Sequence, residues 1–316
     1  MPNLTELQKK RLSILEPDLK KAVQNGAYAK AESILADIQS ILRKTGHETR
    51  LMQSKNLVFE AAMNAGNIDF AKSGFISVRG KVSPRTRLYL EATALLAICY
   101  IKEMDLESAA PFMNWVLSNC AVIRTRTKQV QFRRETTERF MQEALLAGLR
   151  KQGNENIVIE DIKARVEKAI RTKTEDEMFA DIGNAIPKGV VDFMLQVDEL
   201  SKKQLPPADI KLLPPKQELT EPSKLGRSIF GAVQRVIYGA LCDPENDLYQ
   251  KLIRDGLDKV IDTTKVATIF TALLTDAGIA VKTVIVTATA IAVKIGIKVY
   301  CEHNKPKRIM ELRDEK

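Results

Sequence analysis

The residues that most often carry catalysis or bind metals are few in this chain and lie far apart. The two histidines, His47 and His303, lie far apart, and His303 belongs to the trio Cys301-Glu302-His303, whose side-chain types could ligate a metal. Three consecutive side chains cannot all face one ion without a contorted backbone, and no second pair of ligands follows at a zinc-site spacing. We therefore expect no metal site and interpret the trio as an exposed helix end.

Nucleophilic and cofactor chemistry find no better support in the sequence. The motifs GxSxG, HExxH, GxGxxG and GxxxxGK[ST] do not occur. The four cysteines form no CxxC pair, and they stand mostly in apolar segments such as LLAICYI and VIYGALC. Such surroundings are typical of core thiols rather than activated ones. We expect no catalytic residue and no cofactor, and hence a protein that is not an enzyme.

One cluster of basic residues could bind phosphate groups, because the forked donors of arginine suit phosphate oxygens. The segment RTRTKQVQFRRETTERF is rich in basic side chains, and the basic loop before it would lie nearby if the helices stack in chain order. The candidate nucleic-acid-binding residues are Arg124, Arg126, Lys128, Arg133, Arg134, Arg85 and Arg87. The alternative is a solvated helix face, on which Glu135 and Glu138 are local ion-pair partners.

The composition limits the class of protein. The chain has 316 residues, enough for two ordinary domains, and is 45% hydrophobic and 28% charged, which is typical of a globular protein. Ala, Leu, Ile, Lys and Glu dominate and favour helix. The net charge of +9 favours a polyanionic partner without requiring one. Because MPNLTELQKKRL lacks the apolar core of a signal peptide and the cysteines are scattered, we expect a cytoplasmic protein with reduced thiols.

Local signals predict the first two helix starts. Thr5 followed by Gln8 fits a capping box, and Pro17 fits the first turn of a second helix.

The elements that position these residues follow from a repeated pattern in the first 120 residues. A turn residue is followed by an Ala five positions later and by a large apolar residue four positions after that. The three sets are Gly26, Ala31 and Leu35; Gly66, Ala71 and Phe75; and Met104, Ala109 and Met113. The small residue lets two antiparallel helices approach closely, and the large one fills the space between them.

Over roughly residues 17–120 this pattern resembles the tetratricopeptide (TPR) type of helical hairpin, and Leu96, Ala97 and Tyr100 match the first-helix pattern of that family. The sequence departs from the family in three ways. The units lie 40 and 38 residues apart, more than the usual period of about 34 residues. The first helix lacks its Trp, and Met104 stands where the family has a turn Gly. The resemblance implies a TPR-like antiparallel helical array that presents a surface to another protein.

The rest of the chain predicts further helices on both sides of a proline-rich segment. We expect helices at about 125–151, 158–171, 174–203, 223–241 and 243–262. Five of the twelve prolines fall within residues 205–222, which predicts an extended connector. The fold class is therefore all-α, with a TPR-like antiparallel helical array and a small C-terminal helical domain. The predicted ranges are 1–203 for the array and following helices, 204–223 for the linker, 224–302 for the C-terminal domain and 303–316 for a charged tail.

The most apolar stretch, residues 266–300, is either a buried core or a membrane segment. An acidic residue and a glycine divide it at 276–278, so the first piece is shorter than the roughly 20 apolar residues that a bilayer requires. In the second piece, the polar residues Thr283, Thr287, Lys294 and Lys298 fall on one helical stripe. One narrow polar stripe is typical of a mostly buried helix. We expect a core helix from Thr283 to Tyr300, with a strand and membrane insertion as the alternatives.

These observations together predict a non-catalytic protein. We expect a helical-repeat scaffold or accessory subunit that mediates protein–protein interaction in a larger complex. One alternative is a nucleic-acid-binding protein that uses the basic helix 124–139. Another is a membrane-active effector that acts through the apolar segment 266–300. The expected partner is another protein, nucleic acid is the alternative partner, and a membrane is not expected.

Overall fold

Every regular element in the part of the chain that the structure describes is a helix. The computed structural model describes residues 3–151, 155–203, 205–242, 263–303 and 305–313. The predicted all-α class is confirmed. Across these ranges, no helix has both the length and the apolarity needed to cross a membrane. The predicted helix at 243–262 lies outside the described residues.

The chain divides into two compact units, and the division falls inside a long helix rather than at the proline-rich segment. Unit 1 consists of Met1–Thr136, Lys203–Leu205 and Lys307–Lys316, and unit 2 of Thr137–Lys202 and Pro206–Pro306. Residues 137–202, which the sequence places in the first range, thus group with unit 2. Of the predicted tail 303–316, residues 303–306 group with unit 2 and Lys307–Lys316 with unit 1.

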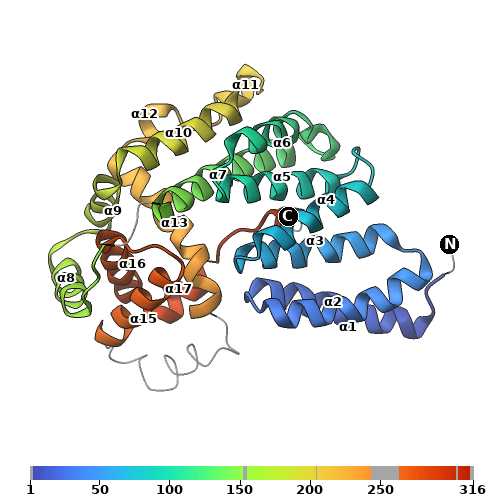
Figure 1. Cartoon of the computed structure of the whole chain (residues 1–316), viewed down its shortest axis with the longest axis horizontal. Helices are drawn as coiled ribbons and strands as arrows, with labels where there is room; N and C mark the ends of the chain where they lie inside the picture. Colours follow the sequence, from blue (N-terminus) through green and yellow to red (C-terminus); the bar gives the residue numbers. More distant parts are fainter. Residues whose placement is uncertain (1–2, 152–154, 204, 243–262, 304, 314–316) are drawn as a thin grey trace. The chain divides into compact units, whose positions relative to one another are not determined.

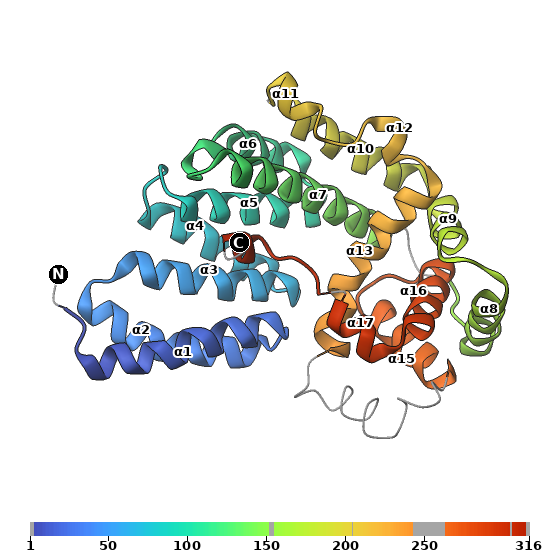
Figure 2. The same cartoon turned by 180° about the vertical axis from the view of Figure 1, so that it is seen from behind.

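Six helices of unit 1 lie side by side in chain order (Figures 1 and 2). They are α1 (Glu6–Gln24), α2 (Tyr28–Thr45), α3 (Glu48–Asn64), α4 (Ile68–Lys81), α5 (Arg87–Lys102) and α6 (Leu106–Ser118), and the short η1 (Cys120–Val122) follows. Each helix packs on the next, and α3 also packs on α1 and α5. Helices α1, α3 and α5 therefore form one layer of unit 1.

Helix α1 begins where the sequence predicts, but it continues past the predicted start of the second helix. Thr5 and Gln8 form the expected capping box, in which each side chain accepts a hydrogen bond from the backbone N–H of the other. Pro17, which the sequence suggests as the beginning of a second helix, lies inside α1. The helix continues through it at the loss of one backbone hydrogen bond, because proline has no N–H.

The three repeat units share one turn geometry. Gly26, Gly66 and Met104, the predicted turn residues, all have left-handed backbones, with φ of 76°, 91° and 61°. The alanine five positions after each turn is fully buried at 0% exposure. Met104 is the only residue other than glycine with a positive φ in the described ranges. It thus holds the glycine position of its unit at a steric cost.

Replacing Met104 with glycine is expected to stabilise unit 1 by about 1 kcal/mol, because glycine adopts the left-handed backbone without strain. Trp115, the one tryptophan of the chain, lies in α6 with its ring 4.9 Å from that of Tyr89. Urea unfolding followed by tryptophan fluorescence therefore reports on unit 1. Met104→Ala is the matched control, since it shortens the side chain and keeps the strain. An equal gain from alanine would contradict this explanation.

Unit 2 begins within the long helix α7 (Arg126–Lys151), close to the predicted bounds of 125–151. The helices that follow are α8 (Ile159–Thr172), α9 (Glu175–Ala185), α10 (Lys188–Lys202), α11 (Pro207–Ile210), α12 (Lys216–Leu219), α13 (Pro222–Leu241), α15 (Thr263–Asp276), α16 (Lys282–Ile295) and α17 (Ile297–His303). The helix predicted at 174–203 is thus two helices, α9 and α10, separated by Pro187. The connector is not extended, because it contains α11 and α12 and buries Leu213 and Leu219.

The apolar stretch forms helices in unit 2, and the strand alternative is wrong. Residues Val284 to Ala292 of α16 are all buried, which confirms a core helix in this segment. The predicted helix from Thr283 to Tyr300 is interrupted, because Gly296, with a φ of 87°, ends α16 before α17 begins. On the predicted polar stripe, Lys294 and Lys298 are exposed, whereas Thr287 is buried at 2% exposure.

Two of the cysteines are bonded to each other. A disulfide joins Cys242, at the end of α13, to Cys301 in α17, across 59 residues of sequence. The expectation of reduced thiols throughout is therefore wrong for this pair. Cys99 and Cys120 are reduced and buried, as expected of core thiols.

Reduction of the disulfide is expected to destabilise unit 2 by about 3 kcal/mol, because the bond limits the freedom of a long loop in the unfolded chain. Thermal unfolding followed by circular dichroism, with and without a phosphine reductant, measures the effect. The Cys242→Ser plus Cys301→Ser variant is the control. It should unfold at the temperature of the reduced wild type, and the reductant should not change that temperature. A reductant effect of equal size in that variant would refute the assignment.

Candidate functional site

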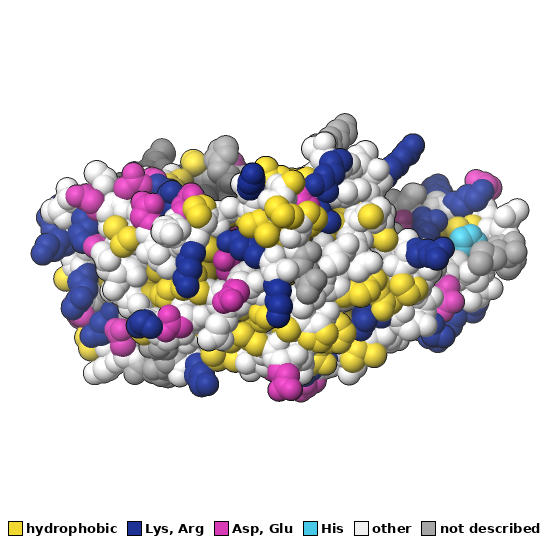
Figure 3. Space-filling model, turned by 90° about the horizontal axis from the view of Figure 1, so that it is seen from above, with side chains coloured by type: hydrophobic (Ala, Val, Ile, Leu, Met, Phe, Trp, Pro, Cys, Tyr) yellow, Lys and Arg dark blue, Asp and Glu magenta, His cyan; other side chains and the backbone are white. Residues whose placement is uncertain are grey.

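The predicted nucleic-acid-binding residues do not form one exposed set. Arg85, Arg124, Arg126 and Arg134 are exposed, and Lys128 is half-buried. Arg133 is only 8% exposed, and its Nε donates to the carbonyl of Leu117 at 2.9 Å. Arg87 pairs with the buried Glu91. On the face in Figure 3, lysine and arginine side chains stand mostly apart, with acidic ones between them. Arg87 and Arg133 therefore do not belong to a surface patch for phosphate.

A different set of charged residues converges in unit 1, on its own C-terminal segment. The segment Lys307–Arg313, here called the tail segment, contains the short helix η2 (Ile309–Arg313) and packs on α3 and α5. Figures 1 and 2 show the last described residues, drawn in red, beside α3. The surface that receives it is here called the tail site. It consists of the carbonyl of Gln24 and the side chains of Asn56, Glu60, Glu91 and Glu135.

The contacts of the tail site come from every second helix, namely α1, α3, α5 and α7. Glu135 of α7 accepts a hydrogen bond from Lys307 Nζ at 2.7 Å. The carbonyl of Gln24, the last residue of α1, accepts one from Arg308 at 3.1 Å. The tail segment therefore contacts four helices at once.

Glu60 binds the backbone of the tail segment. Its side chain is fully buried, and its two carboxylate oxygens accept hydrogen bonds from the N–H groups of Ile309 at 3.0 Å and Met310 at 3.3 Å. These amides begin the short helix η2, where backbone N–H groups have no partner within the helix. A carboxylate at such an end satisfies the amides and favours the helical turn. Glu60 thus binds the backbone at the start of η2.

Glu91 binds the other end of the tail segment through arginine. Both Arg313, from the tail segment, and Arg87, from the same helix α5, donate from Nε to Glu91 Oε1 at 2.9 Å, and Arg313 also donates to Oε2. Burial raises the pKa of Glu91, and the guanidinium groups of Arg313 and Arg87 oppose that rise. The charge of this buried carboxylate therefore depends on both arginines, one of which arrives with the tail.

Apolar contacts complete the site. Ile309, Met310 and Leu312 of the tail segment are each 5% exposed or less. Burial of such side chains contributes about 1.5–3 kcal/mol each. The tail segment thus combines basic ends with a buried apolar middle, and the tail site supplies the matching carboxylates.

Asn56 is a polar group of the tail site that the described residues satisfy only in part. Its side chain is fully buried, and its Nδ2 donates to Met310 Sδ at 3.2 Å. Its Oδ1 accepts no hydrogen bond from any residue in the described ranges. A thioether sulfur is a weak acceptor and offers no donor. The side chain of Met310 therefore fits the space beside Asn56 without matching its chemistry.

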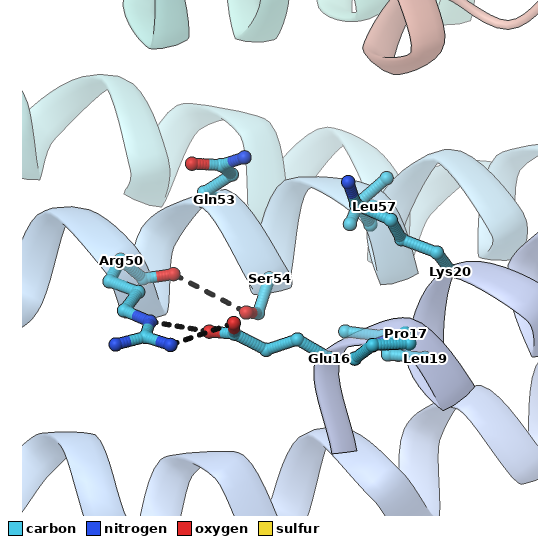
Figure 4. Close-up of a pocket in the computed structure, with 8 residues that line it drawn as sticks. All are labelled: Glu16, Pro17, Leu19, Lys20, Arg50, Gln53, Ser54 and Leu57. Atoms are coloured by element: carbon cyan, nitrogen blue, oxygen red, sulfur yellow. Dashed lines mark hydrogen bonds and ion pairs between the residues drawn. The ribbon is translucent and has the colours of Figure 1, made fainter. Parts of the chain in front are cut away.

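An open cavity lies between α1 and α3, two of the four helices that contact the tail segment. It has a volume of about 580 Å³, and α1 and α3 line it. Figure 4 shows Arg50 of α3 joined to Glu16 of α1 at this cavity, with distances of 2.6 and 2.8 Å. Gln53 lines it too, and it shares one face of α3 with Asn56 and Glu60 because residues three and seven positions apart align on a helix. Gln53 thus belongs both to the lining of the cavity and to the face of α3 that holds the tail segment.

A second cavity, of about 480 Å³, lies in unit 2 between α8, α9 and α16. Three basic residues line it, but Lys173 pairs with Asp181, and Arg165 pairs with Asp161 at 2.8 Å. Acidic neighbours thus balance two of its three cations. We assign no ligand to this cavity.

The sequence contained a signal for the tail site. Glu60 and Glu91 are lone carboxylates inside strongly apolar helical segments, LVFEAAM and LYLEATALLA. Buried carboxylates are rare unless they are paired, so each predicts a partner elsewhere in the chain. Comparison of the chain with protein families, with curated proteins and with solved structures finds no match. The function is therefore inferred from the geometry of this site.

Proposed function

We propose that this protein is a non-catalytic adaptor whose N-terminal helical array, TPR-like by its sequence, binds a segment of another protein at the tail site. The observation that carries the proposal is the docking of the tail segment. A short stretch of chain lies there with its backbone bound by Glu60, one basic side chain bound by Glu91 and its apolar side chains buried. Peptide-recognition sites on helical scaffolds use this combination of backbone, charge and apolar contacts.

Selection from a displayed library of random peptides tests this function. The bait is the full chain carrying Ile309→Asp and Leu312→Asp, here called the opened variant, because charges at these buried positions should release the tail segment. We expect peptides that bind the opened variant and lose binding when Glu91→Gln is added. Glu107→Gln, at an exposed position on α6, is the matched control and should change nothing. Selection of no peptide that depends on Glu91 would count against the adaptor function.

Nucleic-acid binding is the second candidate, supported by the exposed Arg124, Arg126 and Arg134 around the start of α7. Such binding would weaken steeply with salt, because each phosphate contact releases counterions. Gel shifts across salt concentrations, with Arg126→Ala plus Arg134→Ala as the variant, test it. Binding that the variant leaves unchanged would remove these residues from the proposal.

A further inference from the structure

We propose that the natural ligand of the tail site is a basic, partly apolar segment of a partner protein with an amide side chain, Gln or Asn, where the tail segment has Met310. The tail segment is then a tethered competitor that the partner displaces. This inference rests on the proposed function and adds to it the chemical class of the partner and the mode of regulation.

The charge of the site selects the ends of the ligand. Glu91 and Glu135 bind Arg313 and Lys307, which lie at opposite ends of the tail segment. Although the whole chain carries a net charge of +9, three carboxylates, including Glu60, receive this segment. A partner segment with acidic ends would face them with like charge, and that juxtaposition disfavours binding. The site therefore favours a segment with a basic residue at each end.

Asn56 selects the middle of the ligand. An amide has one donor and one acceptor edge, so a Gln at the position of Met310 can donate to Asn56 Oδ1 and accept from Nδ2 at the same time. Gln and Met have side chains of similar length, so the exchange keeps the space filled. The buried, half-satisfied amide is thus a feature that the tail segment leaves unused and that a partner can use.

Competition by the tail segment follows from its tether. A segment joined to its own site acts at an effective concentration on the order of millimolar. A partner segment must therefore bind better than the tail segment does, and the second amide hydrogen bond supplies such an advantage. The cavity beside Arg50 and Gln53 gives a longer segment additional surface that the tail segment does not contact.

Fluorescence anisotropy with labelled synthetic peptides tests the proposal. The first peptide is KPKRIMELRDEK, residues 305–316 of the chain, and two others carry Gln or Leu at the position of Met310. Each is titrated with the wild-type chain and with the opened variant, whose fold is checked by circular dichroism and by Trp115 fluorescence. If the opened variant does not fold, Arg313→Ala in the full chain takes its place as the milder release.

We expect the opened variant to bind the Gln peptide about fivefold more tightly than the Met peptide, because one net hydrogen bond is gained. The Leu peptide should bind more weakly than either. The wild-type chain should bind every peptide at least tenfold more weakly than the opened variant, since its own tail competes. Adding Asn56→Leu to the opened variant should abolish the preference for Gln.

Each other outcome has a definite meaning. If the folded opened variant binds the Met or Leu peptide most tightly, the tail site binds segments but Asn56 does not select an amide. That result would overturn this inference and leave the adaptor function in place. Equal affinity of wild-type chain and opened variant would overturn the competition. The folded opened variant could bind none of the three peptides and still bind library peptides through Glu91. That result would also overturn this inference and leave the adaptor function in place. If it binds neither the three peptides nor any library peptide, the adaptor function is overturned as well.

Discussion

Replacing Glu91 with alanine is expected to destabilise unit 1 by about 3–5 kcal/mol, the usual cost of removing one partner from a buried ion pair. The side chain is fully buried, and both Arg87 and Arg313 donate to it. Without it, Arg87 has lost its buried partner and Arg313 has lost its anchor. Urea unfolding followed by Trp115 fluorescence measures the loss, because Trp115 lies in unit 1.

Two controls separate the charge of Glu91 from its volume. Glu91→Gln keeps the size of the side chain and one acceptor oxygen but replaces the other with a donor, so it should cost less than alanine while still weakening the binding of Arg313. A double-mutant cycle with Arg313→Ala should show a coupling of about 1–3 kcal/mol, as residues of one ion-pair network do. Strict additivity of the two single variants would show that Arg313 does not depend on Glu91.

The second large effect is expected in unit 2, where Gly226→Ala should destabilise the fold by about 4 kcal/mol. A Cβ at Gly226 of α13 would lie 1.8 Å from the carbonyl oxygen of Phe179 in α9. Likewise, a Cβ at Gly183 of α9 would lie 2.0 Å from the carbonyl oxygen of Pro222. Since both obstacles are backbone atoms, no side chain can rotate away, and α9 and α13 would have to separate.

Gly189→Ala is the matched control for this prediction. Gly189 lies in α10 of the same unit, and a Cβ there would meet no atom within 4 Å. Alanine at that position should leave stability unchanged or raise it by up to about 1 kcal/mol, because alanine favours helix more than glycine does. Thermal unfolding followed by circular dichroism compares the two variants. A Gly226→Ala transition at the wild-type temperature would show that α9 and α13 do not pack backbone to backbone.

Local features of the fold could be predicted from the sequence because local chemistry determines them. The capping box at Thr5, the left-handed turns at Gly26 and Gly66, and the long helix after Thr125 all depend on neighbouring residues alone. Met104 could be predicted as a turn residue because it stands at the turn position of the repeated sequence pattern. Methionine by itself does not favour a left-handed backbone. The prediction of a helix start at Pro17 is wrong, because α1 continues through this residue although proline by itself favours a helix start.

Features that depend on distant contacts could not be predicted in the same way. The disulfide joins residues 59 positions apart, and no local pattern pairs Cys242 with Cys301. The tail site brings Glu60 to within 3.0 Å of Ile309, which follows it by 249 residues. The predicted nucleic-acid-binding set includes Arg133 for a related reason. Its neighbours in sequence are charged, but packing buries its side chain. Whether its exposed neighbours bind nucleic acid stays a prediction.

Hydrogen exchange of the tail segment, measured by mass spectrometry on the wild-type chain, tests the central claim most directly. The amides of Ile309 and Met310 are bonded to a fully buried carboxylate, so we expect slow exchange in the free protein. Excess Gln peptide, at millimolar concentration to outcompete the tether, should make the tail segment exchange rapidly while α1 to α6 remain protected. Rapid exchange of the tail segment in the free chain, or protection that excess peptide leaves unchanged, would contradict the account.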